Sequence, residues 1–206
     1  ICVRTKPEIA LGPSNADCKA GLPHGVVLMD AGYGCNTNLR TSVSALALEY
    51  VAGILPNTSV WAPGTGPLPP KKWSGTGRPA TLLRRGGKHQ PVSVKELALG
   101  LPKRAWRSIK WREGAAEWLS SRFARVRVRA ANRDYNLTES RPEEWLLVEW
   151  PEGEKEPTKY WLSNLPKDMA FRQLVDLAKL RWRIERDYQE LKQEVGLGHF
   201  EGRGWR

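Results

Sequence analysis

The sequence predicts an α/β fold whose sheet contains a parallel strand pair. Three observations support this prediction: a strand, a helix and a second strand follow one another over residues 26–55; the middle of the chain alternates apolar and polar residues; and an amphipathic pattern covers about residues 169–195. A helix that connects two strands returns the chain to the same end of the sheet, so the two strands run parallel.

The first predicted strand is the apolar run at residues 26–29, which ends at Asp30 and the turn-like sequence Ala-Gly-Tyr-Gly. Residues 36–48 carry apolar side chains at helical spacing, and residues 50–55 form a second short apolar run. In α/β sheets, binding and catalytic sites lie at the carboxyl ends of the strands. Asp30 is therefore a candidate functional carboxylate, and a simple turn or cap residue is the alternative.

The middle of the chain is basic and then rich in β pattern. Residues 56–90 combine Pro, Gly, Ser and Thr with scattered Lys and Arg, which predicts an irregular loop or lobe. Residues 123–129 alternate strictly, which predicts a half-buried strand with one arginine face. Two further strands are predicted at residues 144–150 and 158–163.

The last predicted element is one helix over about residues 169–195. Apolar side chains recur there at intervals of three and four, Asp168 suits its amino-terminal cap, and Gly196 suits its end. A second face of this helix carries Arg181, Glu185 and Lys192. An ordinary solvated face with internal ion pairs is the alternative explanation for these three residues.

Composition favours a polyanionic partner. Lysine and arginine total 33 against 22 aspartates and glutamates, which gives a net charge of +11 and makes nucleic acid the leading candidate. The three cysteines and three histidines are scattered, so neither a zinc site nor a disulfide framework is predicted. No phosphate-loop or serine-hydrolase motif occurs, which disfavours ATP hydrolysis and serine hydrolysis. No apolar run suits a membrane span and the N-terminus does not resemble a signal peptide, so we expect a cytoplasmic protein. If its partner is DNA, it is expected to associate with the nucleoid when bound.

The segment LRWRIERDYQELKQEVGLGHFEGR resembles the signature of insertion-sequence DDE transposases with the Tyr-Arg-Glu-Lys pattern, Y-x2-R-x3-E-x6-K. Arg181, Glu185 and Lys192 match its last three positions, whereas Ala178 stands where the tyrosine would be. VVLMDAGYG resembles the strand that bears the second aspartate of the family. The resemblance is closest to the branch named for insertion sequence seven-hundred-and-one, within the family-four-like group.

The resemblance implies a ribonuclease H-like mixed sheet, incomplete at its N-terminus, with a β-rich insertion before the last catalytic helix. It divides the chain into a partial core at residues 1–55, a basic, tryptophan-rich insertion at 56–165 and the catalytic helix segment at 166–206. Asp30 and Glu185 are then the catalytic metal ligands for two Mg²⁺ or Mn²⁺ ions. Such hard cations prefer oxygen ligands, and a pair of them assists in-line displacement at phosphorus.

The same resemblance implies that the partner is DNA. Arg181 and Lys192 are expected to hold phosphates near the cleaved end. Further backbone contacts are expected from Lys71, Lys72, Arg125, Arg127 and Arg129, with a solvated surface as the alternative. A tryptophan that stacks on an unpaired base is also implied, with core packing as the alternative. The candidates are Trp61, Trp73, Trp106, Trp111 and Trp118.

The sequence departs from the family at the first catalytic aspartate, because the only acidic residues before Asp30 are Glu8 and Asp17. Neither suits that position, so we expect the chain to start after the first catalytic strand and to be inactive alone. The intact enzyme would cut terminal inverted repeats and join them to target DNA, as a homodimer on paired ends. A binding-only remnant that inhibits intact transposase is the competing hypothesis, and a general basic RNA-associated module is disfavoured.

Overall fold

The computed structural model describes residues 5, 8–9, 11–12, 23–112 and 118–196. The strands are β1 (Val27–Met29), β2 (Tyr50–Ile54), β3 (Ser59–Trp61), β4 (Val92–Ser93), β5 (Trp106–Arg112), β6 (Trp118–Ala130), β7 (Glu144–Pro151) and β8 (Lys159–Ser163). The longer helices are α2 (Ala31–Gly34), α3 (Thr37–Ala45), α4 (Val94–Leu99), α5 (Phe171–Lys179) and α6 (Arg181–Glu194). Two 3-10 turns are η1 (Lys103–Ala105) and η2 (Asp134–Asn136).

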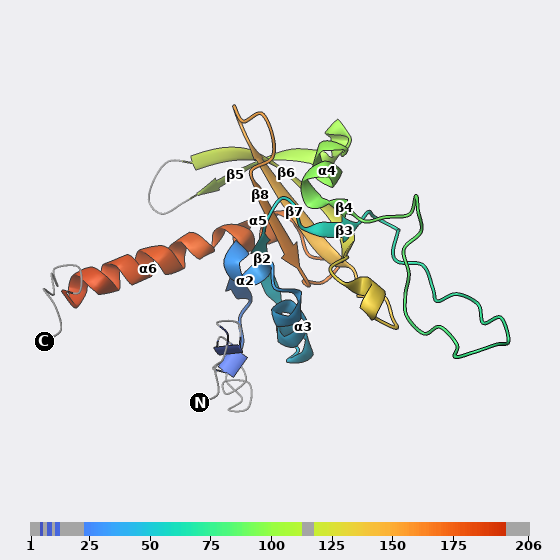
Figure 1. Ribbon diagram of the computed structural model, residues 1–206. Coiled ribbons are helices and arrows are strands. Elements are labelled where there is room, and N and C mark those ends of the chain that lie inside the picture. Colours follow the sequence, from blue (N-terminus) through green and yellow to red (C-terminus); the bar gives the residue numbers. More distant parts are fainter. Residues whose placement is uncertain (1–4, 6–7, 10, 13–22, 113–117, 197–206) are drawn as a thin grey trace, which may run out of the picture.

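In the described residues the strands form one mixed sheet in the order β1-β2-β8-β7-β6-β3-β4, and β5 pairs with β6 (Figure 1). The predicted parallel pair is confirmed, because β1 pairs with β2 in parallel and Val27 lies opposite Tyr50. The other pairings are antiparallel. The mixed α/β architecture expected from the sequence is therefore present.

The strands predicted in the middle of the chain are confirmed, and they join the same sheet as β1 and β2. β8 lies antiparallel to β2, with Val51 opposite Ser163, and β7 connects β8 to β6. Pairing with β8 covers the edge of β2 that β1 leaves open. Strands from the predicted core and from the predicted insertion therefore share one sheet. The division of the chain at residues 55 and 165 stays a prediction.

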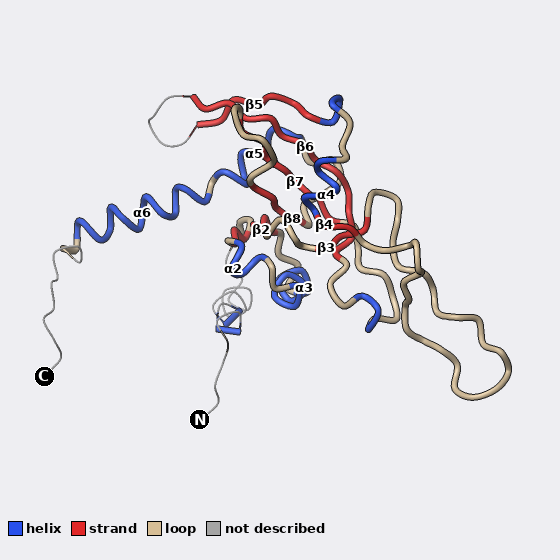
Figure 2. The backbone as a smooth tube through the Cα atoms, turned by 45° about the horizontal axis from the view of Figure 1, so that its top comes forward, coloured by secondary structure: helices blue, strands red, loops and turns tan. Residues whose placement is uncertain are grey.

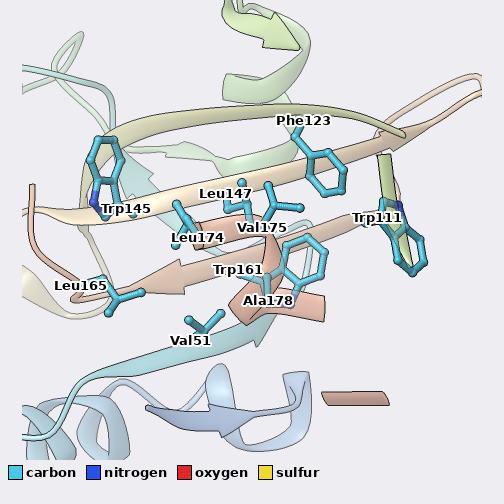
Figure 3. Packing of buried hydrophobic residues seen from close by; sticks show 10 residues of the cluster. All are labelled: Val51, Trp111, Phe123, Trp145, Leu147, Trp161, Leu165, Leu174, Val175 and Ala178. Atoms are coloured by element: carbon cyan, nitrogen blue, oxygen red, sulfur yellow. The ribbon is translucent and has the colours of Figure 1, made fainter. Parts of the chain in front are cut away.

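Helices cover both faces of this sheet. On one face α5 packs Leu174 and Val175 against Leu147 and Trp161, as Figure 3 shows. On the other face, α4 packs against alternate residues of β6, β7 and β8, and α3 packs against β1 and β2. None of the helices in the described ranges is both long and apolar enough to cross a membrane.

The prediction of one helix over residues 169–195 is wrong in one respect, because the helix breaks at Leu180. α5 ends where the Leu180 amide donates to the Leu177 carbonyl, and α6 begins at the next residue in a new direction (Figure 1). α5 buries its apolar residues in the core, whereas Tyr188 and Leu191 of α6 are exposed. Core packing therefore fixes α5 on the sheet, whereas α6 extends beyond the core with exposed apolar side chains.

The helix ends follow the sequence only in part. Asp168 was expected to cap the amino terminus, but α5 starts after Ala170, which provides no side-chain cap. The carboxyl end is as predicted: Gly196 has a φ of +68°, the left-handed conformation that glycine adopts without steric cost.

Candidate active site

Asp30 lies at the carboxyl end of β1, where the chain turns into α2. Its Oδ1 accepts a hydrogen bond of 3.0 Å from the Tyr33 amide, so the carboxylate caps α2. The side chain is 36% exposed, so solvent and ligands reach it. The alternative role as a strand-end cap is thus real, and it leaves the other carboxylate oxygen for a second partner.

That second partner is Arg181, the first residue of α6. Its Nη2 lies 3.5 Å from Asp30 Oδ2, and both side chains are more than a third exposed. The contact joins two predicted site residues from distant parts of the sequence. Because exposed ion pairs contribute at most about 1 kcal/mol, an incoming phosphate or cation could exchange with this one at little cost.

Glu185 follows Arg181 by one helical turn in α6, but its side chain lies outside the described part of the structure. Lys192 is further along the same helix, and its Nζ lies 4.5 Å from the centroid of the Tyr188 ring. With a rise of about 1.5 Å per residue, Lys192 is roughly 16 Å from Arg181 along the helix axis. The structure therefore brings Arg181 to Asp30 and holds Lys192 away from it.

A pocket opens beside this contact, and we call it the Asp30 pocket. Its walls combine aromatic and cationic side chains with backbone from the ends of β1 and β2. The lining includes Ala31, Gly53, Leu55, Trp111, Trp161 and Lys179. Arg181 and Lys159 also line it, and its named lining residues include no acidic side chain. Such a pocket suits an anionic group with an apolar part.

Below the pocket, Lys179 forms an ion pair that the sequence analysis missed. Its Nζ donates to both carboxylate oxygens of Glu149, at 2.6 and 2.7 Å, and lies 3.7 Å from the Trp111 ring centroid. Both charged side chains are buried. In the sequence, a lysine near the end of an amphipathic helix is typical of a solvated residue, so only its neighbours in three dimensions reveal this role.

Comparison with known protein families assigns the chain to one of them. A family model described as DDE superfamily endonuclease matches residues 3–117, which is more than half of the chain. The chain belongs to this DDE superfamily endonuclease family. The match includes Asp30 and ends before α6, so it leaves Arg181, Glu185 and Lys192 untested. No curated protein matches the chain.

Membership of the DDE endonucleases supports a nuclease of transposase type that acts on DNA and belongs to a superfamily that uses divalent metals. Among the residues whose positions are described, no three His, Cys, Asp or Glu side chains gather into a metal site. Asp30 nevertheless fits one part of such a site, because a partly exposed carboxylate is the donor that Mg²⁺ prefers. It can serve as one ligand, and further ligands have to come from elsewhere.

The lysines and arginines predicted to contact DNA occupy two different environments. Lys71 and Lys72 are exposed in the long loop between β3 and β4. Figures 1 and 2 show that this loop and α6 project to opposite sides of the sheet. Contacts to DNA at both places would therefore require DNA that extends across the molecule.

The arginine face of β6 is engaged within the protein. Arg125 donates to the Met169 carbonyl and stacks on Trp145 at 4.5 Å, and Arg127 donates to the Glu143 carbonyl. Arg129 donates to the Arg141 carbonyl at 2.6 Å. Burial lowers the pKa of Arg125 and of Arg127 from its usual value. These contacts explain the arginine face without DNA, and its role in DNA binding stays a prediction.

The tryptophans named as stacking candidates also divide by environment. Trp111 is buried and lines the Asp30 pocket, whereas Trp73 is exposed in the long loop. Trp61 is buried and donates to Asp134, and Trp106 packs edge-on against Trp150. The side chain of Trp118 lies outside the described part. Of the described candidates, Trp111 is the one that lines the pocket next to Asp30.

Proposed function

We propose that this DDE endonuclease is the catalytic part of an insertion-sequence DNA transposase. It cleaves phosphodiesters at transposon ends and transfers the resulting 3′ ends to target DNA. The observation that carries the proposal is the contact between Asp30 and Arg181 beside a cationic pocket at the carboxyl ends of β1 and β2. That contact places a carboxylate next to a guanidinium, which are the groups needed to hold a divalent metal and a phosphate.

In this proposal Asp30 and Glu185 hold two Mg²⁺ or Mn²⁺ ions, together with a further carboxylate. When bound, such ions activate the attacking oxygen and stabilise the leaving oxygen. The hydrogen bond from the Tyr33 amide to Oδ1 orients the Asp30 carboxylate, and its Oδ2 contacts Arg181. We also propose that the chain belongs to the branch of this family with the Tyr-Arg-Glu-Lys pattern.

Arg181 binds the phosphate at the cleaved bond. Its planar guanidinium can hold two phosphate oxygens at once, and it reaches that position by exchanging the exposed Asp30 contact for the DNA. Lys192 holds a phosphate farther along α6. The additional backbone contacts proposed are those of Lys71, Lys72, Arg125, Arg127 and Arg129. Two copies of the intact enzyme act on paired inverted repeats.

A second candidate is a DNA-binding protein without cleavage activity. It is favoured by one observation: the side chains named in the lining of the Asp30 pocket are cationic or uncharged, which suits binding of the DNA backbone. Such a protein would bind inverted repeats and could block an intact transposase by occupying the ends or by forming mixed dimers.

Cleavage of a labelled duplex that carries the inverted repeat of the element, with Mg²⁺ or Mn²⁺, tests the proposal. We compare the 206-residue chain with a version lengthened at its N-terminus by the upstream coding sequence of the element, and we expect cleavage from the extended version. In that version, Asp30→Asn and Glu185→Gln should each lower the rate at least about a hundredfold, because several kcal/mol of transition-state stabilisation are lost.

Asp168→Asn is the matched control, since Asp168 is an exposed carboxylate that is not named in the lining of the Asp30 pocket and does not belong to α6. It should leave the rate unchanged. Equal cleavage by Glu185→Gln and the parent sequence would remove Glu185 from the site. Binding without cleavage by the extended version would establish the second candidate instead.

A further inference from the structure

A second pocket shares the Leu55 side chain with the Asp30 pocket, and we call it the Arg133 pocket. It lies between the start of α3, the segment that enters β3 and the residues that follow β6. Because Leu55 lines both pockets and is itself half exposed, the two form neighbouring parts of one surface across the end of β2.

The Arg133 pocket is lined by groups that donate hydrogen bonds to phosphate. Its polar residues include Asn57, Thr58, Ser59, Arg85, Asn132 and Arg133. The named lining contains two arginines and no acidic side chain. Arginine, serine, threonine and asparagine are among the side chains that bind nucleic-acid backbones.

Arg133 has an unusual backbone conformation. Its φ of +50° and ψ of +30° are left-handed, which is uncommon for a residue with a long side chain. The following turn η2 fixes this geometry, because the Asn136 amide donates to the Arg133 carbonyl. The side chain is exposed, and it makes no hydrogen bond or ion pair within the part of the chain that the structure describes. An arginine with a strained backbone and no ion pair among the described residues suggests that its guanidinium binds an external anion.

Arg85 is held in place from below. Its Nε and Nη2 donate to Asp134 Oδ1 at 3.0 and 2.7 Å, and its guanidinium lies 5.1 Å from the Tyr135 ring centroid. Asp134 is 1% exposed and also accepts from Trp61 Nε1. Nη1 of Arg85 has no hydrogen-bond partner among the described residues, so one edge of an oriented guanidinium remains available.

A purely structural ion pair accounts for Arg85 and Asp134 alone. It does not account for Arg133, whose left-handed backbone costs free energy and whose side chain makes no hydrogen bond or ion pair with the described residues. Glycine would occupy that position without strain. The combination of an anchored arginine and a strained, unpaired one therefore points to a ligand.

We propose that the Arg133 pocket is a second subsite for the DNA sugar–phosphate backbone. It holds a phosphate on the opposite side of Leu55 from the phosphate that reacts at Asp30. This inference rests on the proposed DNA function and extends it to residues outside the catalytic set. The backbone then crosses Leu55 between the two pockets, and Arg85 and Arg133 fix its path.

The test measures binding of the full chain to a long labelled DNA duplex by fluorescence anisotropy over a series of salt concentrations. Arg133→Ala and Arg133→Gly should weaken binding about fivefold at moderate salt and lower the slope of log affinity against log salt by about one. Arg133→Gly should also leave the thermal midpoint unchanged or higher, because glycine relieves the left-handed strain. Arg133→Lys should restore part of the affinity.

Arg104→Ala is the matched control. Arg104 is an exposed arginine in η1 that lines neither pocket, so its loss changes the net charge equally. Equal effects of Arg104→Ala and Arg133→Ala would overturn the subsite and leave only general charge attraction. Inorganic phosphate at low millimolar concentration should leave the Arg133-dependent part of the DNA affinity unchanged. If phosphate at that concentration displaces the DNA from the pocket, the pocket binds free phosphate and the proposal is overturned.

The outcomes separate this inference from the proposed function. DNA binding that depends on Arg133, without cleavage by the extended chain, supports the subsite and contradicts the nuclease. Cleavage with binding that is independent of Arg133 supports the nuclease and overturns the subsite. Absence of DNA binding by the unaltered chain would overturn the subsite, whereas cleavage by the extended chain decides the nuclease.

Discussion

Replacing Lys179 by methionine should lower the free energy of unfolding by about 3–5 kcal/mol, because it leaves the carboxylate of Glu149 buried without its cation. Glu149 is 2% exposed and receives both hydrogen bonds from Lys179. Methionine keeps most of the length and apolar volume of the lysine side chain. The decrease in the free energy of unfolding therefore reports the unpaired charge of Glu149 and not the creation of a cavity.

The double variant Lys179→Met with Glu149→Leu should recover most of this loss, since replacing a buried ion pair with apolar residues is often neutral or stabilising. Arg172→Ala is the control, because Arg172 forms an exposed pair with Asp176 on the same helix α5. Removal of that pair should cost no more than about 0.5 kcal/mol.

Urea unfolding of the four proteins decides between these expectations. A Lys179→Met variant as stable as the parent would show that Lys179 and Glu149 do not form a buried pair in solution. The pair also has a functional consequence, because Lys179 lines the Asp30 pocket and α5 leads directly into Arg181. Loosening α5 should therefore weaken DNA binding at the pocket even in molecules that remain folded.

Sequence patterns predicted the local elements well. The apolar runs at residues 26–29 and 50–55, and the alternation at 123–129, correspond to β1, β2 and β6. These predictions succeeded because burial on a sheet imposes a strict pattern on each strand by itself. The antiparallel pairing of β2 with β8 was not predicted, because it joins residues distant in sequence and depends on which edges the whole sheet leaves open.

The helix break at Leu180 and the arginine face of β6 show a second limit. No proline or glycine marks the break, which is set by where the packing of α5 on the sheet ends. Likewise, the alternation at Arg125 and Arg127 predicts that both point to one face, but not that Trp145 and backbone carbonyls lie on that face. Periodicity gives the direction of a side chain and leaves its partners open.

The candidate site was predictable only through combined evidence. The position at a strand end singled out Asp30, and the family resemblance singled out Arg181. In the structure, Arg181 Nη2 lies 3.5 Å from Asp30 Oδ2. The family match covers Asp30 without testing its role, so that role stays a prediction. Lys179, Glu149 and Arg133 had no comparable pattern, because a buried pair or a left-handed arginine has the same sequence appearance as ordinary surface residues.

Replacing Gly34 by alanine should destabilise the chain by about 1–3 kcal/mol or more, and should also lower any cleavage activity. A Cβ at Gly34 would overlap the carbonyl oxygen of Gly53 and lie 3.1 Å from the Ala52 Cβ. Both obstacles belong to β2, a central strand that cannot yield as a flexible side chain could. The helix α2 must therefore move away from the sheet.

Movement of α2 would carry Asp30 with it, because the Asp30 carboxylate caps α2 through the Tyr33 amide. Gly25→Ala is the control, since a Cβ there meets nothing within 4 Å, and its stability should change by less than about 0.5 kcal/mol. Thermal unfolding and cleavage by the upstream-extended chain are measured for both variants. Normal stability and normal cleavage in Gly34→Ala would mean that α2 does not pack on Gly53 in solution. Loss of cleavage under conditions where the variant remains folded would instead tie activity to the position of Asp30, since this substitution leaves every proposed metal and phosphate ligand in the chain.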